Sequence, residues 1–203
     1  MDFDTLHYFP KTLPSPKSSW AVFIDRDGVI WGEKEVGTPF KDYDLYPGAS
    51  EAIAKLNKLG IYTVVITNQA RVARGLITET QARKSNQELE ERLAGHGAHI
   101  DLYLYCPHSE FADVKKYQSD CNWRKPGSGM LEFVGKNLGI NLKKSFIIGD
   151  QARDYLAGKK VRATSIGVKT GKGGKDEVFS GKPDVWRQDL FKAVEHILSV
   201  TGQ

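Results

Sequence analysis

The chain has 203 residues, which is enough for one well-cored domain and at most two. Hydrophobic residues make up 40% and charged residues 27%, as in soluble globular proteins, and no apolar run approaches a membrane span. The net charge of +4 is too small to indicate a nucleic-acid partner, but it is compatible with a phosphorylated substrate. The acidic N-terminus lacks a signal-peptide pattern, so we expect a cytoplasmic protein.

Strand and helix signals alternate along the chain. Residues 1–19 contain three prolines and are predicted to form an arm, followed by a single domain at residues 20–203. Apolar, β-branched runs predict strands at residues 21–24, 61–66, 100–105, 145–148 and 163–168. Amphipathic spacing and capping signals predict helices at residues 49–59, 78–94, 128–138, 151–159 and 189–200. This alternation predicts an α/β fold with a mainly parallel sheet covered on both faces.

Two stretches between these elements are predicted to be loops. Residues 106–126 are polar and show little periodicity. Residues 169–182 are rich in glycine and lysine but do not meet the spacing of a phosphate-binding loop, so we expect a mobile loop in solvent.

Two carboxylates follow the first predicted strand. Asp25 and Asp27 come directly after residues 21–24, and Gly28 marks the turn that ends the strand. Ligands of open α/β sheets bind at the carboxyl ends of the strands. One carboxylate there can attack a substrate, bind Mg²⁺ or do both, and its neighbour can move a proton. Taken alone, the pair is explained equally well by a simple turn.

Polar side chains occupy three further strand ends or helix starts. Thr67-Asn68 follows the second predicted strand and can donate hydrogen bonds to phosphoryl oxygens. Arg124-Lys125 follows the polar loop and supplies positive charge. Asp150 follows the fourth strand and suits a hard cation, and Asp154 lies one helical turn further on. Each feature alone is typical of a cap, a turn or a surface basic pair.

In this order, the four motifs resemble those of the haloacid dehalogenase superfamily. The chain is more narrowly similar, over about residues 20–175, to the D,D-heptose 1,7-bisphosphate and histidinol-phosphate phosphatases. The segments that carry this likeness are Asp25-Arg26-Asp27-Gly28, Thr67-Asn68-Gln69, Ala73-Arg74-Gly75, Cys106-Pro107-His108 and Arg124-Lys125-Pro126. The resemblance implies a three-layer, Rossmann-like fold without a large cap domain. It also implies a Mg²⁺-dependent phosphomonoester hydrolase that forms an aspartyl-phosphate.

The resemblance assigns a role to each matching residue. Asp25 would be the nucleophile and Asp27 the general acid and base. Mg²⁺ would be held by Asp25, the backbone carbonyl of Asp27 and Asp150, with Asp154 supporting the site from outside. Thr67 and Lys125 would stabilise the phosphoryl group. The residues expected to hold the substrate are Arg26, Asn68, Gln69, Arg74, Arg124 and Gln151.

The polar loop carries part of a zinc motif. The subfamily has the pattern Cys-x-His…Cys-x-Cys, and the residues that match it here are Cys106, His108 and Cys121. Trp123 occupies the fourth position, although structural zinc sites usually have four protein ligands. Water or Asp120 would complete a weaker Zn²⁺ site. Alternatively, the loop holds no metal and Trp123 packs on the core, with Phe111 or Tyr117 as neighbours.

The substrate is less constrained than the chemistry. Trp31 stands where the subfamily commonly has Asn, and Ala70-Arg71 where Ser-Gly is frequent; we expect both near the substrate mouth. Heptose 1,7-bisphosphate ranks first because Arg71, Arg74 and Arg124 suit two anionic ends. The alternatives are histidinol phosphate, a nucleic-acid 3′-phosphate, or a binding protein that has lost catalysis. We expect a monomer that acts on a small-molecule phosphate ester, with no membrane contact and without nucleic acid.

Overall fold

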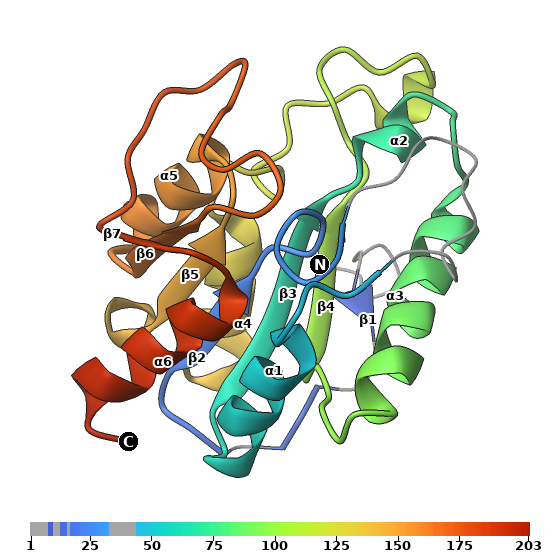
Figure 1. The fold of residues 1–203 in the computed structure, drawn as a ribbon. Coiled ribbons are helices and arrows are strands. Elements are labelled where there is room, and N and C mark those ends of the chain that lie inside the picture. Colours follow the sequence, from blue (N-terminus) through green and yellow to red (C-terminus); the bar gives the residue numbers. More distant parts are fainter. Residues whose placement is uncertain (1–7, 10–12, 16, 33–43) are drawn as a thin grey trace.

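The computed structural model describes residues 8–9, 13–15, 17–32 and 44–203 (Figure 1). One seven-stranded sheet has the order β1-β4-β3-β2-β5-β6-β7. Its strands are β1 (Tyr8–Phe9), β2 (Ala21–Ile24), β3 (Tyr62–Asn68), β4 (Leu102–Cys106), β5 (Phe146–Gly149), β6 (Thr164–Val168) and β7 (Val185–Arg187). Strand β1 is antiparallel to β4, and every other neighbouring pair is parallel. The predicted mainly parallel α/β sheet is therefore confirmed.

Helices cover both faces of this sheet. They are α1 (Ala49–Lys58), α2 (Ala70–Ala73), α3 (Glu79–Ala94), α4 (Gly129–Leu138), α5 (Ala152–Val161) and α6 (Leu190–Thr201). Short 3₁₀ turns occupy Lys115–Tyr117 and Leu142–Lys144. None of the helices in the described residues combines the length and apolar character needed to cross a membrane.

Alternation along β2 separates two hydrophobic cores. Val22 and Ile24 pack with apolar residues of α1, α3 and α6, whereas Phe23 packs with those of α4 and α5. Successive strand residues point to opposite faces, so the all-apolar β2 must be covered on both sides. The result is three layers, with helices, sheet and helices in turn (Figure 1).

Two edge strands were not predicted from the sequence. Tyr8–Phe9 lies in the predicted arm but pairs with β4, and β7 lies in a stretch for which no element was predicted. Strands of two or three residues are too short to show a hydrophobic period. The rest of the arm up to residue 7, with residues 10–12 and 16, lies outside the described residues.

Candidate active site

The sheet brings the ends of its central strands together. Asp25 follows β2, Thr67 lies near the end of β3, and Asp150 follows β5. Strand β2 lies between β3 and β5, and the Asp25 N–H donates to the Ile148 carbonyl at 2.9 Å. Because the three strands are parallel, their carboxyl ends meet at one edge, where such sheets bind ligands. The polar residues that the sequence placed at these strand ends therefore share one site.

Lys125 lies at the centre of this site. Its ammonium Nζ is 2.8 Å from Asp25 Oδ1 and 2.7 Å from Asp154 Oδ1, and it donates to the Ile66 carbonyl at 2.9 Å. Asn68 fixes the backbone of Lys125, because its side-chain amide accepts from the Lys125 N–H and donates to the Lys125 carbonyl, both at 2.9 Å. Asn68, which we expected to hold substrate, thus positions the lysine.

Three buried carboxylates surround the ammonium group. Ligand oxygens of Asp25, Asp150 and Asp154 lie within 4.8 Å of one another. Burial raises the pKa of Asp25 well above the ordinary aspartate value; Lys125 opposes this shift, and the other two carboxylates add to it. Burial, followed by the charge of Asp154, raises the pKa of Asp150 to about 6. One lysine cannot balance three carboxylates.

A divalent cation fits this charge imbalance. Asp150 Oδ1 is buried and has no hydrogen-bond partner among the described residues, so it is available as a ligand. Hard cations such as Mg²⁺ prefer carboxylate oxygens, and a buried unpaired charge is costly. Asp25 and Asp150 belong to the Mg²⁺ set expected from the sequence. Asp154 lies in the same cluster, and its pairing with Lys125 suits the supporting role expected for it.

A ring of donors holds Asp27. Its Oδ1 accepts from Trp31 Nε1 at 2.7 Å and from Arg26 Nε at 3.2 Å. Its Oδ2 accepts from Gln69 Nε2 at 3.0 Å, from Arg26 Nη2 at 3.1 Å and from Thr67 Oγ1 at 3.4 Å. Burial works to raise the pKa of Asp27, but the charge of Arg26 and the surrounding donors lower it below the ordinary value.

Arg26 and Gln69 are turned inward. Arg26 is only 2% exposed, and its Nη1 donates to Ser85 at 2.6 Å and to Asn86, both on α3. Gln69 is buried, and besides Asp27 it contacts Thr67 at 3.0 Å. We expected both residues to hold substrate; their contacts instead support Asp27. The residue types alone do not show which way a side chain turns from a strand end.

Arginines gather beside the site. Arg124 is half-buried and donates to the His108 carbonyl at 3.1 Å, and Arg74 is exposed. Burial lowers the pKa of Arg124, and the nearby charges of Arg153 and Arg74 lower it further. Arg153, to which the sequence analysis gave no role, binds Asp176 through Nε at 2.9 Å and Nη2 at 3.0 Å. No sequence signal distinguished Arg153 from an ordinary helix residue.

The first turn of α5 positions Asp154. Gln151 is the N-cap residue of α5, and its backbone N–H donates to Asp154 Oδ2 at 3.0 Å. Its side chain is partly exposed, so a substrate contact by Gln151 stays a prediction. An acidic residue in the first turn is stabilised by the positive end of the helix dipole. This cap fixes Asp154 for its pairing with Lys125.

The glycine-rich loop lies directly on Asp150. The Lys172 N–H donates to Asp150 Oδ2 at 2.6 Å, and the Gly174 N–H donates to the Asp150 carbonyl at 2.6 Å. Gly171 has a φ of 58°, and a Cβ there would collide with Asp150 Oδ2. We expected this loop to lie in solvent, and Gly171 and Lys172 are exposed. No sequence signal indicated that the backbone N–H groups of Lys172 and Gly174 also bind Asp150.

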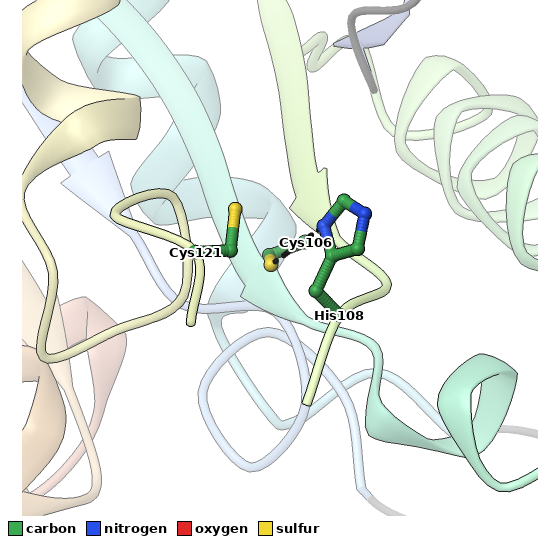
Figure 2. Close-up of side chains that lie close together, drawn as sticks. All are labelled: Cys106, His108 and Cys121. Atoms are coloured by element: carbon green, nitrogen blue, oxygen red, sulfur yellow. Dashed lines mark hydrogen bonds between the residues drawn. The ribbon is translucent and has the colours of Figure 1, made fainter. Parts of the chain in front are cut away.

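The three candidate zinc ligands lie close together, with Cys106 at the end of β4 and the other two on the loop that follows (Figure 2). Cys106 Sγ is 3.8 Å from His108 Nδ1, and the ligand atoms of Cys106, His108 and Cys121 lie within 4.8 Å of one another. The hydrogen bond from Cys106 is the main cause that lowers the pKa of the Cys121 thiol to about 5. Thiolate and imidazole are the donors that zinc prefers, so this set fits Zn²⁺ with three protein ligands.

Trp123 packs on the core, as one of the alternatives predicted. Its ring contacts Phe133 with centroids 5.3 Å apart. The expected neighbours are wrong: Phe111 is 88% exposed, and Tyr117 instead contacts the ring of His108. Asp120 is exposed and is not part of the three-residue cluster.

Comparison with known proteins establishes the family. Residues 22–103 match a model described as haloacid dehalogenase-like hydrolase, and residues 122–193 match a HAD-hydrolase-like model. A D-glycero-beta-D-manno-heptose-1,7-bisphosphate 7-phosphatase from Photorhabdus laumondii is 36% identical over 153 residues, covering 75% of this chain and 81% of the relative. The chain belongs to the haloacid dehalogenase-like hydrolases. It is a phosphatase of this family.

Further relatives agree with this assignment. An enzyme of the same name from Rhodopseudomonas palustris is 39% identical over 140 residues, covering 68% of the phosphatase and 77% of the relative. A D,D-heptose 1,7-bisphosphate phosphatase from B. bronchiseptica, complexed with magnesium and phosphate, superimposes with a TM-score of 0.78 at 27% identity, covering 90% and 99%. A putative HAD-like phosphatase from Mesorhizobium loti has a TM-score of 0.77 at 30% identity, covering 95% and 93%.

Proposed function

We propose that this phosphatase removes the 7-phosphate of a heptose 1,7-bisphosphate through an aspartyl-phosphate on Asp25. The observation that carries this proposal is the buried Lys125, which lies between Asp25 and Asp154 next to the unpartnered Asp150 Oδ1. Such a set neutralises the charge of a phosphoryl group and directs a carboxylate at it. The names of the relatives from Photorhabdus and Rhodopseudomonas support the choice of substrate.

One oxygen of Asp25 is left for attack. Lys125 Nζ and the Arg26 N–H both bind Oδ1, at 2.8 Å each, and within the described ranges no hydrogen bond or ion pair reaches Oδ2. Oδ2 attacks phosphorus, a new O–P bond forms, and the bond from phosphorus to the sugar oxygen breaks. Mg²⁺ held by Asp25, Asp150 and the Asp27 carbonyl would supply charge that offsets the repulsion between carboxylate and phosphate.

Asp27 moves the proton in both halves of the reaction. It gives a proton to the departing sugar oxygen, and it then takes one from the water that attacks the aspartyl-phosphate. The donors around Asp27 favour its charged form, whereas an arriving phosphate dianion raises the pKa of a nearby carboxyl group. Substrate binding thus favours the protonated form that the first half requires.

A second anionic group would lie at the arginines. The positive charges of Arg153 and Arg74 act on Arg124, so several cations would lie at the substrate mouth. Arginine binds phosphate oxygens in two places and stays charged, which suits the second phosphate of a bisphosphate. The cationic amine of histidinol phosphate would be repelled there.

We also propose a zinc ion on the loop between β4 and α4. Cys106, His108 and Cys121 would hold it, and water would complete the fourth position because Trp123 packs against Phe133. Such an ion would hold the segment that leads to Arg124 and Lys125. The role assigned to it is structural, and no step of the reaction depends on it.

A substrate panel tests the proposed activity. Heptose 1,7-bisphosphate, histidinol phosphate and a DNA 3′-phosphate are each incubated with the enzyme and Mg²⁺, and phosphate release is measured. We expect turnover of the heptose ester to exceed the others, and Asp25→Asn to abolish it because an amide is not a nucleophile. Faster phosphate release from histidinol phosphate or from the DNA 3′-phosphate would show that heptose 1,7-bisphosphate is not the preferred substrate. No release from any ester, with the fold intact, would favour a binding protein.

A further inference from the structure

Trp31 is buried beneath the proposed acid and base rather than at the substrate mouth. Its side chain is 0% exposed, and its Nε1–H donates to Asp27 Oδ1 at 2.7 Å. The turn after β2 folds back to place it there, because the Gly28 N–H donates to the Trp31 carbonyl at 2.8 Å. The Arg26 guanidinium lies 5.3 Å from the centroid of the indole ring. We expected Trp31 near the substrate mouth; it lies against Asp27, but its side chain is buried and not exposed to a substrate.

The two oxygens of Asp27 have different surroundings. Oδ1 faces Trp31 and Arg26 Nε, which lie on its own turn. Oδ2 is the oxygen nearest Thr67, whose hydroxyl is 3.4 Å away and is expected to contact the phosphoryl group. Oδ2 also accepts from Gln69 Nε2 at 3.0 Å and from Arg26 Nη2 at 3.1 Å. Among the described contacts only Oδ2 meets Thr67, so Oδ2 is the oxygen nearer to the expected position of the phosphoryl group.

The indole N–H suits an anchor for either protonation state. When Oδ2 carries the proton, Oδ1 remains a carbonyl oxygen and still accepts a hydrogen bond. The terminal torsion of an aspartate side chain is broad and roughly two-fold, so an unanchored carboxyl group samples many orientations. Among the hydrogen bonds that described residues make to this carboxylate, the one from Trp31 is the shortest, at 2.7 Å.

We propose that Trp31 is a positioning residue for proton transfer: its indole N–H holds Asp27 Oδ1 so that Oδ2 protonates the leaving oxygen of the substrate. This inference rests on the proposed role of Asp27 in phosphate ester hydrolysis. The covalent steps are unchanged, since the proton passes from Oδ2 to the sugar oxygen as its bond to phosphorus breaks.

The inference predicts a dependence on the leaving group. A sugar oxygen is a poor leaving group and needs the proton, whereas p-nitrophenolate departs without one. The parameter kcat/KM reports the steps up to formation of the aspartyl-phosphate, so it isolates this first proton transfer. Loss of the anchor should slow the sugar ester and spare the aryl ester. General damage to the site would slow both equally.

Two variants remove the N–H. Trp31→Phe is the simple one, and replacement of Trp31 by β-(3-benzothienyl)alanine keeps the bicyclic shape while sulfur takes the place of Nε1–H. Trp20→Phe is the matched control, since Trp20 packs against Phe146 and is not part of the site. Circular dichroism and thermal unfolding check the fold of each variant. The benzothienyl variant decides the question if Trp31→Phe does not fold.

For each protein, kcat/KM is measured with heptose 1,7-bisphosphate and with p-nitrophenyl phosphate. The inference predicts that both Trp31 variants lose about tenfold or more with the sugar ester and less than about twofold with the aryl ester. Equal losses on both esters, or no loss, in the benzothienyl variant would overturn it. A wild-type enzyme that hydrolyses neither ester would instead contradict the proposed function.

Discussion

Lys125 Nζ lies 2.8 Å from Asp25 Oδ1, and the two side chains are 1% and 9% exposed. The same ammonium group binds Asp154 at 2.7 Å, so one cation serves two carboxylates inside the protein. Asp150 adds a third carboxylate to the cluster. The charge balance of the site therefore depends on Lys125, and the divalent cation that we propose would complete it.

Lys125→Met should abolish turnover and destabilise the protein when metal is absent. Removing one partner of a buried ion pair leaves an uncompensated charge and typically costs about 3–5 kcal/mol. Urea unfolding near neutral pH in chelator measures this loss, and Mg²⁺ should restore part of it. Lys144→Met is the control, because Lys144 is exposed. A Lys125→Met protein as stable as wild type in chelator would show that the cluster carries no such charge.

The metal-free protein should lose stability as the pH rises through about 6. Burial and Asp154 raise the pKa of Asp150 to about 6 in the folded state, whereas an unfolded aspartate titrates near 3.8. The proton held by the folded state stabilises the protein at low pH. This contribution, about 3 kcal/mol at most, is lost as the pH rises from about 4 to about 6.

Denaturant unfolding in chelator at several pH values measures this effect. Asp150→Asn should reduce the loss of stability, and saturating Mg²⁺ should remove it for the wild-type protein. A wild-type stability that rises steadily from pH 4 to pH 7 in chelator would contradict the assignment.

Gly171→Ala should weaken Mg²⁺ binding by displacing the loop from Asp150. A Cβ at this position would collide with Asp150 Oδ2, the oxygen that accepts from the Lys172 N–H. Partners that orient metal ligands are typically worth 10–100-fold in affinity, so we expect about a tenfold higher Mg²⁺ concentration for half-maximal activity.

Gly173→Ala is the matched control for that experiment. Gly173 also has a φ of 58°, but the three atoms nearest to a Cβ there all belong to the Lys169 backbone, the closest at 3.2 Å. Both alanine variants therefore place a side chain at a positive φ and share the backbone strain. Only Gly171→Ala brings a Cβ against Asp150. Equal changes in Mg²⁺ dependence for both variants would show that strain, rather than the contact with Asp150, is responsible.

The protein purified without chelator should contain about one equivalent of zinc, and Cys121→Ala should lose it. Elemental analysis by mass spectrometry measures both. Asp120→Ala is the control, because Asp120 is exposed and outside the cluster of three ligands. Less than roughly a tenth of an equivalent in the wild-type protein would leave Trp123 packing as the support of this loop.

The sequence predicted the parts of the site that follow from strand ends. Asp25, Thr67 and Asp150 had to meet, because adjacent parallel strands carry their carboxyl ends at one edge. The directions of side chains beyond those ends were not predictable. Trp31 reaches Asp27 only because the turn after β2 folds back through the Gly28 N–H, and Arg26 turns toward α3 instead of the mouth.

Contacts made by backbone groups were also not predictable, because they leave no pattern in the amino-acid sequence. The loop that holds Asp150 does so through the N–H groups of Lys172 and Gly174, which any residue type except proline would supply. Its glycines favoured a mobile loop from composition alone. In the structure, Gly171 instead permits the close approach to Asp150.

Trapping of the covalent intermediate tests the central claim most directly. Enzyme mixed with Mg²⁺ and heptose 1,7-bisphosphate is quenched during turnover and treated with borohydride, which reduces an aspartyl-phosphate to homoserine. Peptide mass spectrometry then locates the modified position. We predict homoserine in place of Asp25, with Asp27 and Asp150 unchanged. Phosphate release with Asp25 unmodified, or modification of Asp27 or Asp150 instead, would contradict the account.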